Sequence, residues 1–377
     1  MYTDADGLSR DGIDVAEVLR QLHLPGSAAH GIMDAASLGR VAAAAFVGVR
    51  ADSNEFTRGI EAELKRIILS VLALPQGAAC FLTGSGTESI LLGLFAARCF
   101  APKRNVRPRV IGPRSLHHSV RKCVALLDIE LITTDVDAEQ RADPQALGRA
   151  IDRRTIAIVA SAPSWASGVW DPIDQIAAVA AEHELYFHVD ACIGGFLLPF
   201  LGDSNRGASL SMSGTSSVAV DLHKFGYAPL SLSALCFPHD VRADSTELAA
   251  FAACPTAASG LSLASDRPFW PIAAAWAIAR SLGRSGYARL ARQMIARRAR
   301  MSEASADRGL SAGGEENSPV LRLSSTPDAP LSLLGERLTR AGIPHVLCPT
   351  ENHARLRVDP SLGDDEFEGL IQKLTSL

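Results

Sequence analysis

The stretch Val218-Ala219-Val220-Asp221-Leu222-His223-Lys224-Phe225-Gly226-Tyr227 places one lysine directly after a short apolar run. The β-branched and apolar residues predict a buried strand that ends just before Lys224. A lysine beside a buried strand is costly unless it is paired, neutral or covalently used. By position alone, Lys224 is more often an ordinary surface lysine. The remainder of the chain decides between these two interpretations.

Composition restricts the class of protein. The chain has 377 residues, 47% of them hydrophobic and 21% charged, which is typical of a globular protein with a large core. The net charge of −4 gives no reason to expect a nucleic-acid or membrane partner. The seven cysteines include no CxxC pair, so neither a zinc site nor a disulfide framework is expected. The first ten residues lack the apolar core of a signal peptide, so we expect a cytoplasmic protein.

A glycine-rich turn is the second feature that suggests a ligand site. Residues 79–83 predict a short strand, Gly84-Ser85-Gly86-Thr87-Glu88-Ser89 follows it, and residues 90–97 predict a helix. In this arrangement free backbone amides and the positive end of a helix dipole can face a phosphate group. A structural turn with a helix cap is an equally common origin of the pattern. The turn is neither a Walker loop nor a dinucleotide-binding fingerprint.

Strand and helix signals alternate through the middle of the chain. Strands are predicted at 110–111, 130–133, 155–160, 186–189, 218–220 and 234–237, and helices at 116–127, 144–151 and 172–183. This alternation predicts an α/β fold with a mainly parallel sheet that is covered on both faces. Ligands bind such sheets beyond the carboxyl ends of the strands.

The predicted organisation has three parts. Residues 1–54 form an N-terminal arm or cap, residues 55–265 a large domain, and residues 266–377 a small α+β domain. A long helical region covers 267–300, with a break near Gly283 to Gly286, and residues 311–317 predict a flexible linker or loop. Beyond it the pattern predicts strands at 320–323, 345–347 and 354–358 and helices at 331–341 and 364–374.

Together, four polar positions fit one cofactor, pyridoxal 5′-phosphate. This cofactor needs a lysine amine, an acid beside the pyridine nitrogen, an anion cradle and a group lying flat against its ring. Lys224, Asp190, the Gly86–Thr87 turn and His117 can supply these in that order. Asp190 follows a predicted strand, although aspartate at such a position is also a common turn or helix cap.

Five motifs in the same order resemble one family. These are the segments beginning at Phe81, His117, Ser161, His188 and Asp221, which read FLTGSGTESILL, HHSVRK, SAPSWASGVWDPI, HVDACIGGF and DLHKFGYAP. They resemble the fold-type-I pyridoxal-phosphate enzymes of the group II decarboxylase family, and within it the sphingosine-1-phosphate lyases. The likeness covers roughly residues 55–240 and is weaker up to about residue 300.

The resemblance implies a role for each matching residue. Lys224 would carry the cofactor, Asp190 would pair with the pyridine nitrogen, and His117 would stack on the ring. The other cofactor-binding positions would be Ser85, Gly86, Thr87, His223 and Ser161. The resemblance also implies a seven-stranded-type sheet and a homodimer with shared active sites.

We therefore expect a pyridoxal-phosphate carbon–carbon lyase that acts on a small amine or amino acid, most plausibly an amino-acid decarboxylase. Arg357 or Arg355, on a predicted strand of the small domain, could bind a substrate carboxylate, although an ordinary edge-strand arginine is an equal alternative. The alternatives are retro-aldol cleavage of a phosphorylated amino alcohol, transamination, carbon–carbon bond formation in a biosynthetic pathway, and a non-catalytic scaffold. Leu230 stands where the lyases often carry lysine, which counts against a long-chain phosphorylated substrate.

Overall fold

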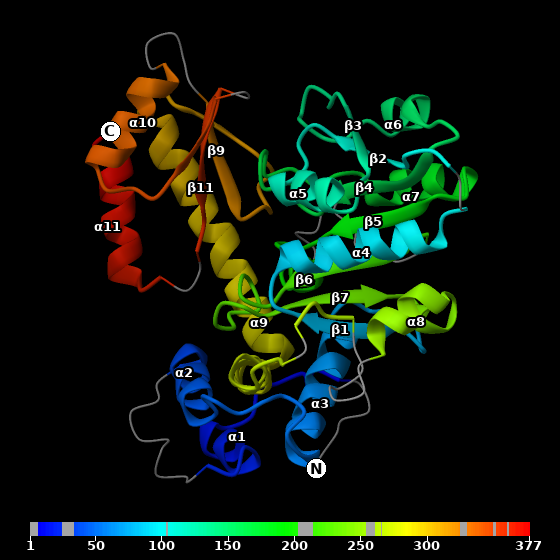
Figure 1. Ribbon diagram of the computed structural model, residues 1–377. Coiled ribbons are helices and arrows are strands. Elements are labelled where there is room, and N and C mark those ends of the chain that lie inside the picture. The colour runs from blue at the N-terminus through cyan, green and yellow to red at the C-terminus, as the bar shows by residue number, and fades with distance from the viewer. Residues whose placement is uncertain are drawn as a thin grey trace.

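The computed structural model describes residues 7–24, 34–102, 105–202, 214–253, 261–264, 266–324, 330–349, 352–359 and 362–377. Residue 265, the predicted end of the large domain, lies outside these residues, as do parts of the predicted N-terminal arm. Within the described residues, a seven-stranded sheet has the order β1-β7-β6-β5-β4-β2-β3 (Figure 1). Its strands are β1 Ala79–Thr83, β2 Arg109–Pro113, β3 Glu130–Thr134, β4 Thr155–Ser161, β5 Tyr186–Asp190, β6 Ser217–Asp221 and β7 Ser233–Phe237.

The sheet is mainly parallel, as predicted. Only β7 runs antiparallel to its neighbours, β1 and β6. The other neighbouring strands pair in parallel. Because β1, β4, β5 and β6 point the same way, their carboxyl ends meet at one edge, which is where ligands bind in this type of sheet.

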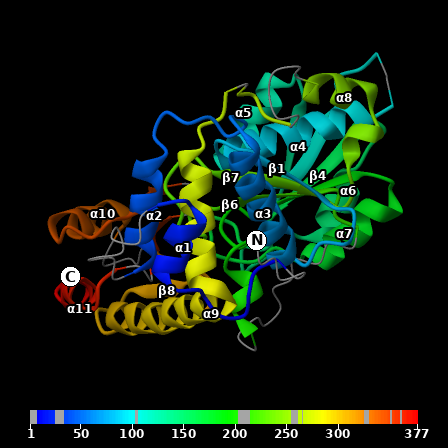
Figure 2. The same cartoon turned by 90° about the horizontal axis from the view of Figure 1, so that it is seen from below.

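Helices cover both faces of the sheet (Figure 2). One face packs against α4 Gly86–Phe100, α5 His118–Leu126 and α8 Thr246–Ala252. The opposite face packs against α3 Glu55–Val71, α6 Pro144–Ala150 and α7 Ile173–Glu182. The central strands β4, β5 and β6 and the antiparallel β7 are almost entirely buried, which explains why they read as continuous apolar runs rather than as alternating patterns. Within the described residues, sequence reasoning missed α8 and the short 3₁₀ turns η2 Leu198–Phe200 and η4 Val241–Ala243.

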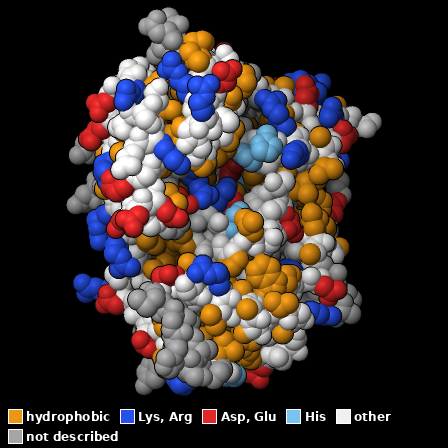
Figure 3. Space-filling model, turned by 90° about the vertical axis from the view of Figure 1, so that its left-hand side faces the viewer, with side chains coloured by type: hydrophobic (Ala, Val, Ile, Leu, Met, Phe, Trp, Pro, Cys, Tyr) orange, Lys and Arg blue, Asp and Glu red, His pale blue; other side chains and the backbone are white. Residues whose placement is uncertain are grey.

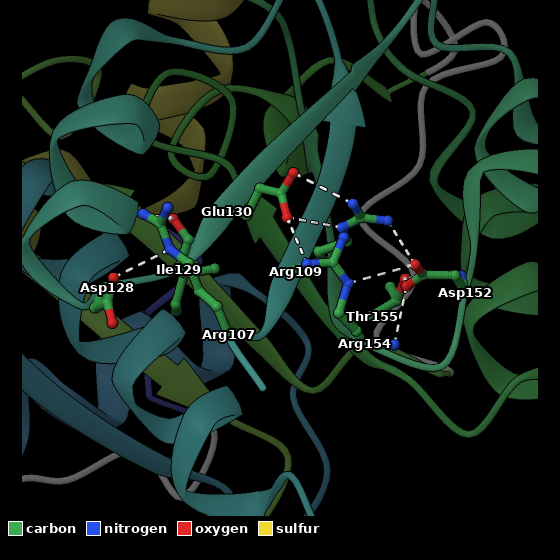
Figure 4. A network of polar contacts seen from close by, with 8 residues as sticks. All are labelled: Arg107, Arg109, Asp128, Ile129, Glu130, Asp152, Arg154 and Thr155. Atoms are coloured by element: carbon green, nitrogen blue, oxygen red, sulfur yellow. Dashed lines mark hydrogen bonds and ion pairs between the residues drawn. The ribbon is translucent and has the colours of Figure 1, made fainter. Parts of the chain in front are cut away.

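Ion pairs join the strands at the opposite, amino-terminal edge of the sheet (Figure 4). Arg109 at the start of β2 lies 2.9 Å from Glu130 of β3 and 2.5 Å from Asp152, which precedes β4. Arg154 lies 3.0 Å from Glu130 and 3.7 Å from Asp152. This alternation of charges ties three neighbouring strands together at the edge that carries no predicted site residue.

A long helix connects the two parts of the chain. α9 Trp270–Ala306 packs against α2 Ala35–Ala45 and, further along, against the small domain. Its helical backbone breaks at Gly283, where φ is 58°, as the sequence predicted. The N-terminal segment crosses α9 at this break, and backbone bonds of 2.9 Å join Ile13 to Arg280 and Ser9 to Arg284. A side chain at position 283 would meet the backbone of Asp11 at 2.5 Å, so glycine allows this crossing.

The small domain contains a four-stranded sheet in the order β10-β11-β9-β8, which is antiparallel throughout its described strands. Its strands are β8 Ser311–Gly313, β9 Val320–Ser324, β10 Val346–Cys348 and β11 His353–Arg357, and its helices are α10 Leu331–Arg340 and α11 Asp364–Leu374. The linker or loop expected at 311–317 is wrong for its first three residues. Residues 311–313 form an edge strand, and Glu315 and Asn317 accept hydrogen bonds of 3.3 and 2.8 Å from the backbone and the indole of Trp170.

Near the N-terminus, α1 Val15–Gln21 is a short helix whose first turn is capped by the Asp14 side chain. Both α1 and α2 contact α9 of the same chain.

Candidate active site

Seven of the predicted site residues line one cavity at the carboxyl edge of the sheet. The cavity has a volume of about 290 Å³, and these seven residues are Ser85, Gly86, Thr87, His117, Asp190, His223 and Lys224. On the face in Figure 3, histidine side chains and Lys or Arg side chains border a hollow near the centre of the molecule. A larger cavity of about 730 Å³ lies near the amino-terminal edge and contains none of the predicted site residues.

Lys224 reaches the cavity from the turn that follows β6. Its Nζ lies 2.9 Å from Oδ2 of Asp221, a side chain that is 4% exposed. Burial lowers the pKa of Lys224, but nearby negative charge outweighs burial, so the pKa is raised overall. Burial also raises the pKa of the neighbouring Cys192 thiol well above its ordinary value. Because that thiol is neutral at neutral pH, Asp221 and Asp190 are the charges that act on Lys224.

Asp221 is a site residue that sequence reasoning missed. Its Oδ1 accepts a hydrogen bond of 2.6 Å from the Ser233 hydroxyl. Its Oδ2 lies 3.6 Å from Nε2 of His223, whose Nδ1 donates to the Leu232 carbonyl at 2.9 Å. Asp221 stood in the quoted motif as the last residue of the strand, three residues before the lysine. This three-residue spacing was the sequence signal for the contact between Asp221 and Lys224.

Asp190 ends β5 and is 7% exposed. Its Oδ1 accepts a hydrogen bond of 3.1 Å from the backbone of Cys192, which fixes the carboxylate at the edge of the cavity. Ser161 is the register partner of Asp190 on β4 but is not among the residues that line the cavity. The Ser161 backbone donates instead to the buried carboxylate of Asp171 at 2.8 Å.

His117 caps the N-terminus of α5. The Ser119 backbone N–H donates to His117 Nδ1 at 3.3 Å, and the Ser119 hydroxyl lies 2.7 Å from the same nitrogen. A nitrogen that accepts from a backbone N–H carries no proton of its own, so the proton of the neutral ring lies on Nε2. The pKa of His117 is lowered to about 4, mainly by burial; Asp190 raises it, and the positive charge of His118, Lys224 and Arg355 lowers it. The ring is therefore neutral at pH 7.

The glycine-rich turn lies between β1 and the start of α4, as expected. Ser85 caps α4 by accepting a hydrogen bond of 3.2 Å from the Glu88 backbone, and Gly86 and Thr87 begin the helix. A Cβ at Gly86 would lie 2.6 Å from both Asp221 Oδ1 and Cys192 Sγ. Only glycine therefore fits here without displacing a residue of the cavity. Helix amides, a lysine amine, a buried carboxylate and a neutral imidazole in one cavity match the donor set that pyridoxal phosphate needs.

The two candidate arginines lie in different places. The Arg355 guanidinium lies 4.9 Å from the ring centroid of Trp165, a residue of the cavity, and donates to its carbonyl at 3.1 Å. Arg357 lines an adjoining pocket of about 170 Å³ that also contains His223, Lys224 and Tyr227. There it forms an ion pair with Asp359. The two pockets share Lys224.

The chain belongs to the pyridoxal-dependent decarboxylase family, whose conserved domain matches residues 59–308. It is similar to the sphingosine-1-phosphate lyase of Arabidopsis thaliana, with 37% identity over 216 residues that cover 55% of this chain and 39% of that protein. It is also similar to a probable L-tyrosine/L-aspartate decarboxylase of Methanothermobacter thermautotrophicus, with 30% identity over 63% of this chain and 65% of that protein.

Structural comparison agrees with the sequence comparison. The solved sphingosine-1-phosphate lyase of Burkholderia pseudomallei superposes with a TM-score of 0.80 at 25% identity, covering 91% of this chain and 82% of that one. The predicted fold type I is thereby confirmed. The chain spans only 39–43% of the length of the plant and rat lyases that it matches. In the described parts of the chain, no helix has the length and apolar character needed to cross a membrane.

Proposed function

We propose that the chain is a pyridoxal-phosphate-dependent carbon–carbon lyase that decarboxylates an amino acid. The observation that carries this proposal is the meeting of Lys224, Asp190 and His117 around one cavity with the Gly86 turn. Membership of the pyridoxal-dependent decarboxylase family supports the cofactor. Similarity to a probable L-tyrosine/L-aspartate decarboxylase supports the reaction class.

Pyridoxal phosphate, when bound, supplies a ring that accepts the electron pair left at a substrate carbon when a bond to it breaks. The residues of this chain would hold and tune that ring. Lys224 would attach it through its amine, and the amides at Gly86 and Thr87 would bind its phosphate. Asp190, buried beside the cavity, would keep the ring nitrogen protonated because an opposite charge favours the charged form.

His117 would do more than lie flat against the ring. Its proton is on Nε2 because Nδ1 accepts from Ser119. A neutral imidazole with this tautomer can donate a hydrogen bond or a proton toward the cavity. His117 and Lys224 are therefore the two candidates to return a proton to the substrate carbon after carbon dioxide leaves.

The arginines would recognise the substrate carboxylate. Arg357 is the stronger candidate, because it is itself among the residues that line a pocket with Lys224, whereas Arg355 lines neither pocket, and the ion pair with Asp359 fixes the Arg357 guanidinium. Arg355 stacks on Trp165 at the other cavity. In Arg357→Met we expect a higher KM for amino acids with little change in kcat, and a smaller effect in Arg355→Met. Equal effects of the two variants would contradict this assignment.

We further propose a cytoplasmic homodimer in which each subunit contributes to the other's active site. The motif resemblance supports the dimer. In the described residues, large apolar side chains are exposed at Leu230, which is 73% exposed and close to the lysine turn, and at Leu263, which is 58% exposed. Sedimentation velocity tests the dimer, and mixing two inactive variants tests the sharing of sites.

The first experiment tests cofactor attachment. Purified protein is loaded with pyridoxal phosphate, reduced with borohydride and digested, and we expect the cofactor's mass on the peptide that contains Lys224. Lys224→Ala should bear no cofactor, whereas Lys122→Ala, which changes an exposed lysine, should behave as the wild type. No attachment to the wild type would refute the proposed cofactor chemistry and leave a scaffold.

The second experiment identifies the reaction. Release of carbon dioxide from amino acids would support the decarboxylase. Release of an aldehyde from phosphorylated amino alcohols would instead support the retro-aldol alternative, which the similarity to sphingosine-1-phosphate lyases favours. Dependence on a keto acid would support an aminotransferase.

A further inference from the structure

Two cysteines lie opposite each other in the large sheet. Cys80 of β1 and Cys236 of β7 are register partners in an antiparallel pair. Such partners have Cα atoms about 4.5–5.5 Å apart, and disulfides join Cα atoms about 4.4–6.8 Å apart. Both side chains belong to the same buried cluster, so they lie on the same face of the sheet. Of the six cysteines that the structure describes, only these two are sheet partners.

The surroundings of the two thiols differ. Cys236 is fully buried, whereas Cys80 is 7% exposed on β1, the edge strand of the sheet. A hydrogen bond with Cys80, together with burial, raises the pKa of Cys236. Contact between the two sulfur groups is thus already present in the reduced protein. Cys80 is the thiol that a small molecule would reach first.

We propose that Cys80 and Cys236 are a reversible oxidation site at which a small hydroperoxide produces a cross-strand disulfide. The Cys80 sulfur, as its thiolate, attacks the terminal peroxide oxygen, the O–O bond breaks, and an alcohol or water leaves with the proton. The Cys236 sulfur then displaces water from the oxidised Cys80 sulfur. Overall, two thiols and one hydroperoxide give one disulfide, one alcohol (or water) and one water. The thiols lose two electrons and the O–O bond gains them.

The position of the bond gives it a structural consequence. β1 leads directly into the Ser85–Thr87 turn, and β7 lies between β1 and the strand that precedes Lys224. The disulfide would therefore join β1, the edge strand that leads into the glycine-rich turn, to β7, which lies beside β6. This inference does not depend on the proposed function, since neither thiol is among the residues that line the cavity of the site.

Tryptic peptide mapping of the full-length protein tests the proposal. Trypsin releases residues 67–98 and 225–242, and each of these peptides contains a single cysteine, Cys80 and Cys236 respectively. Native protein is exposed to hydrogen peroxide, free thiols are alkylated in denaturant, and the digest is analysed without reductant. We expect a linked pair of these two peptides that dithiothreitol separates.

Matched variants make the result specific. Cys123→Ser changes another buried cysteine, on α5, and should form the same linked pair. Cys236→Ala and Cys80→Ala should not form it, and circular dichroism shows whether they are folded. Two results would overturn the proposal. One is alkylation of both thiols in peroxide-treated wild type, and the other is a linked pair that forms only when peroxide is added to unfolded protein.

Discussion

Asp221 joins Ser233 to Lys224: one carboxylate oxygen accepts from the serine hydroxyl at 2.6 Å, and the other lies 2.9 Å from the lysine Nζ. The lysine turn and the antiparallel strand β7 are thereby connected through a buried carboxylate. The register places Ser233 opposite both Thr83, which precedes the phosphate turn, and Asp221. Three segments of the site thus meet at one position of the sheet.

Asp221→Asn should lower the pKa of Lys224. The carboxylate lies 2.9 Å from the amine and favours its protonated form, so its removal should move the titration midpoint of Lys224 to lower pH. The measurement is the pH dependence of Lys224 labelling by an amine-selective reagent, followed by peptide mass spectrometry. An unchanged labelling midpoint would mean that Asp221 does not act on the charge of Lys224. Glu303→Gln, which changes an exposed carboxylate on α9, serves as the control.

Gly86→Ala should weaken binding of pyridoxal phosphate. The added methyl would lie 2.6 Å from Asp221 and Cys192, and overpacking of this kind costs about 1–3 kcal/mol, which corresponds to roughly fivefold to a hundredfold in affinity. Titration of the protein with the cofactor measures the change. Gly369→Ala is the matched control, because a Cβ there meets nothing within 4 Å. Equal affinities of the two variants would contradict the predicted cradle.

His188 should make the protein less stable in acid. It is fully buried beside Ser217, whose hydroxyl lies 2.7 Å from Nδ1, and burial lowers its pKa from 6.5 to about 4 while Asp190 opposes this. Between pH 6.5 and about 4, His188 therefore binds a proton in the unfolded chain but not in the folded chain. The stabilisation is therefore complete above pH 6.5 and is lost as the pH falls toward 4.

The pKa of His188 falls from 6.5 in the unfolded chain to about 4 in the folded one. This difference predicts that protonation lowers the free energy of unfolding by roughly 3 kcal/mol. Urea unfolding of the wild type and of His188→Gln between pH 7.5 and 4.5 measures it. The wild type should lose more unfolding free energy over this interval than the variant does. Parallel curves would show that His188 does not contribute.

Arg109→Met should destabilise the sheet without changing the site. The guanidinium bridges Glu130 and Asp152 at the amino-terminal edge, and its removal leaves two partly buried carboxylates with less compensation (Figure 4). We expect a lower free energy of unfolding in urea, with a smaller difference in high salt. Arg149→Met removes an exposed pair at 3.7 Å and should have almost no effect. A change in cofactor affinity in Arg109→Met would contradict the separation of the two edges.

The sequence by itself determined the strands of the large sheet and most of the residues at its carboxyl edge. Buried parallel strands read as short apolar runs, and a polar residue at the end of a run or just after it lies at the ligand-binding edge, as Asp190 and Lys224 do. The break at Gly283 was also visible in the sequence, because a glycine interrupts the helical pattern there.

Only the tertiary structure determined which residues from distant segments contact one another. Asp221 meets Lys224 and Ser233 only because β6 and β7 pair in one register, and no local pattern specifies that register. Arg355 and Arg357 are two residues apart on one strand, yet their surroundings differ because the strand crosses from Trp165 to the Lys224 pocket. Residues 311–313 were expected to belong to a linker or loop. They form β8 instead, because they pair with β9 at the edge of the small sheet. Local propensity is encoded in neighbouring residues, whereas contacts between distant segments depend on how the whole chain packs.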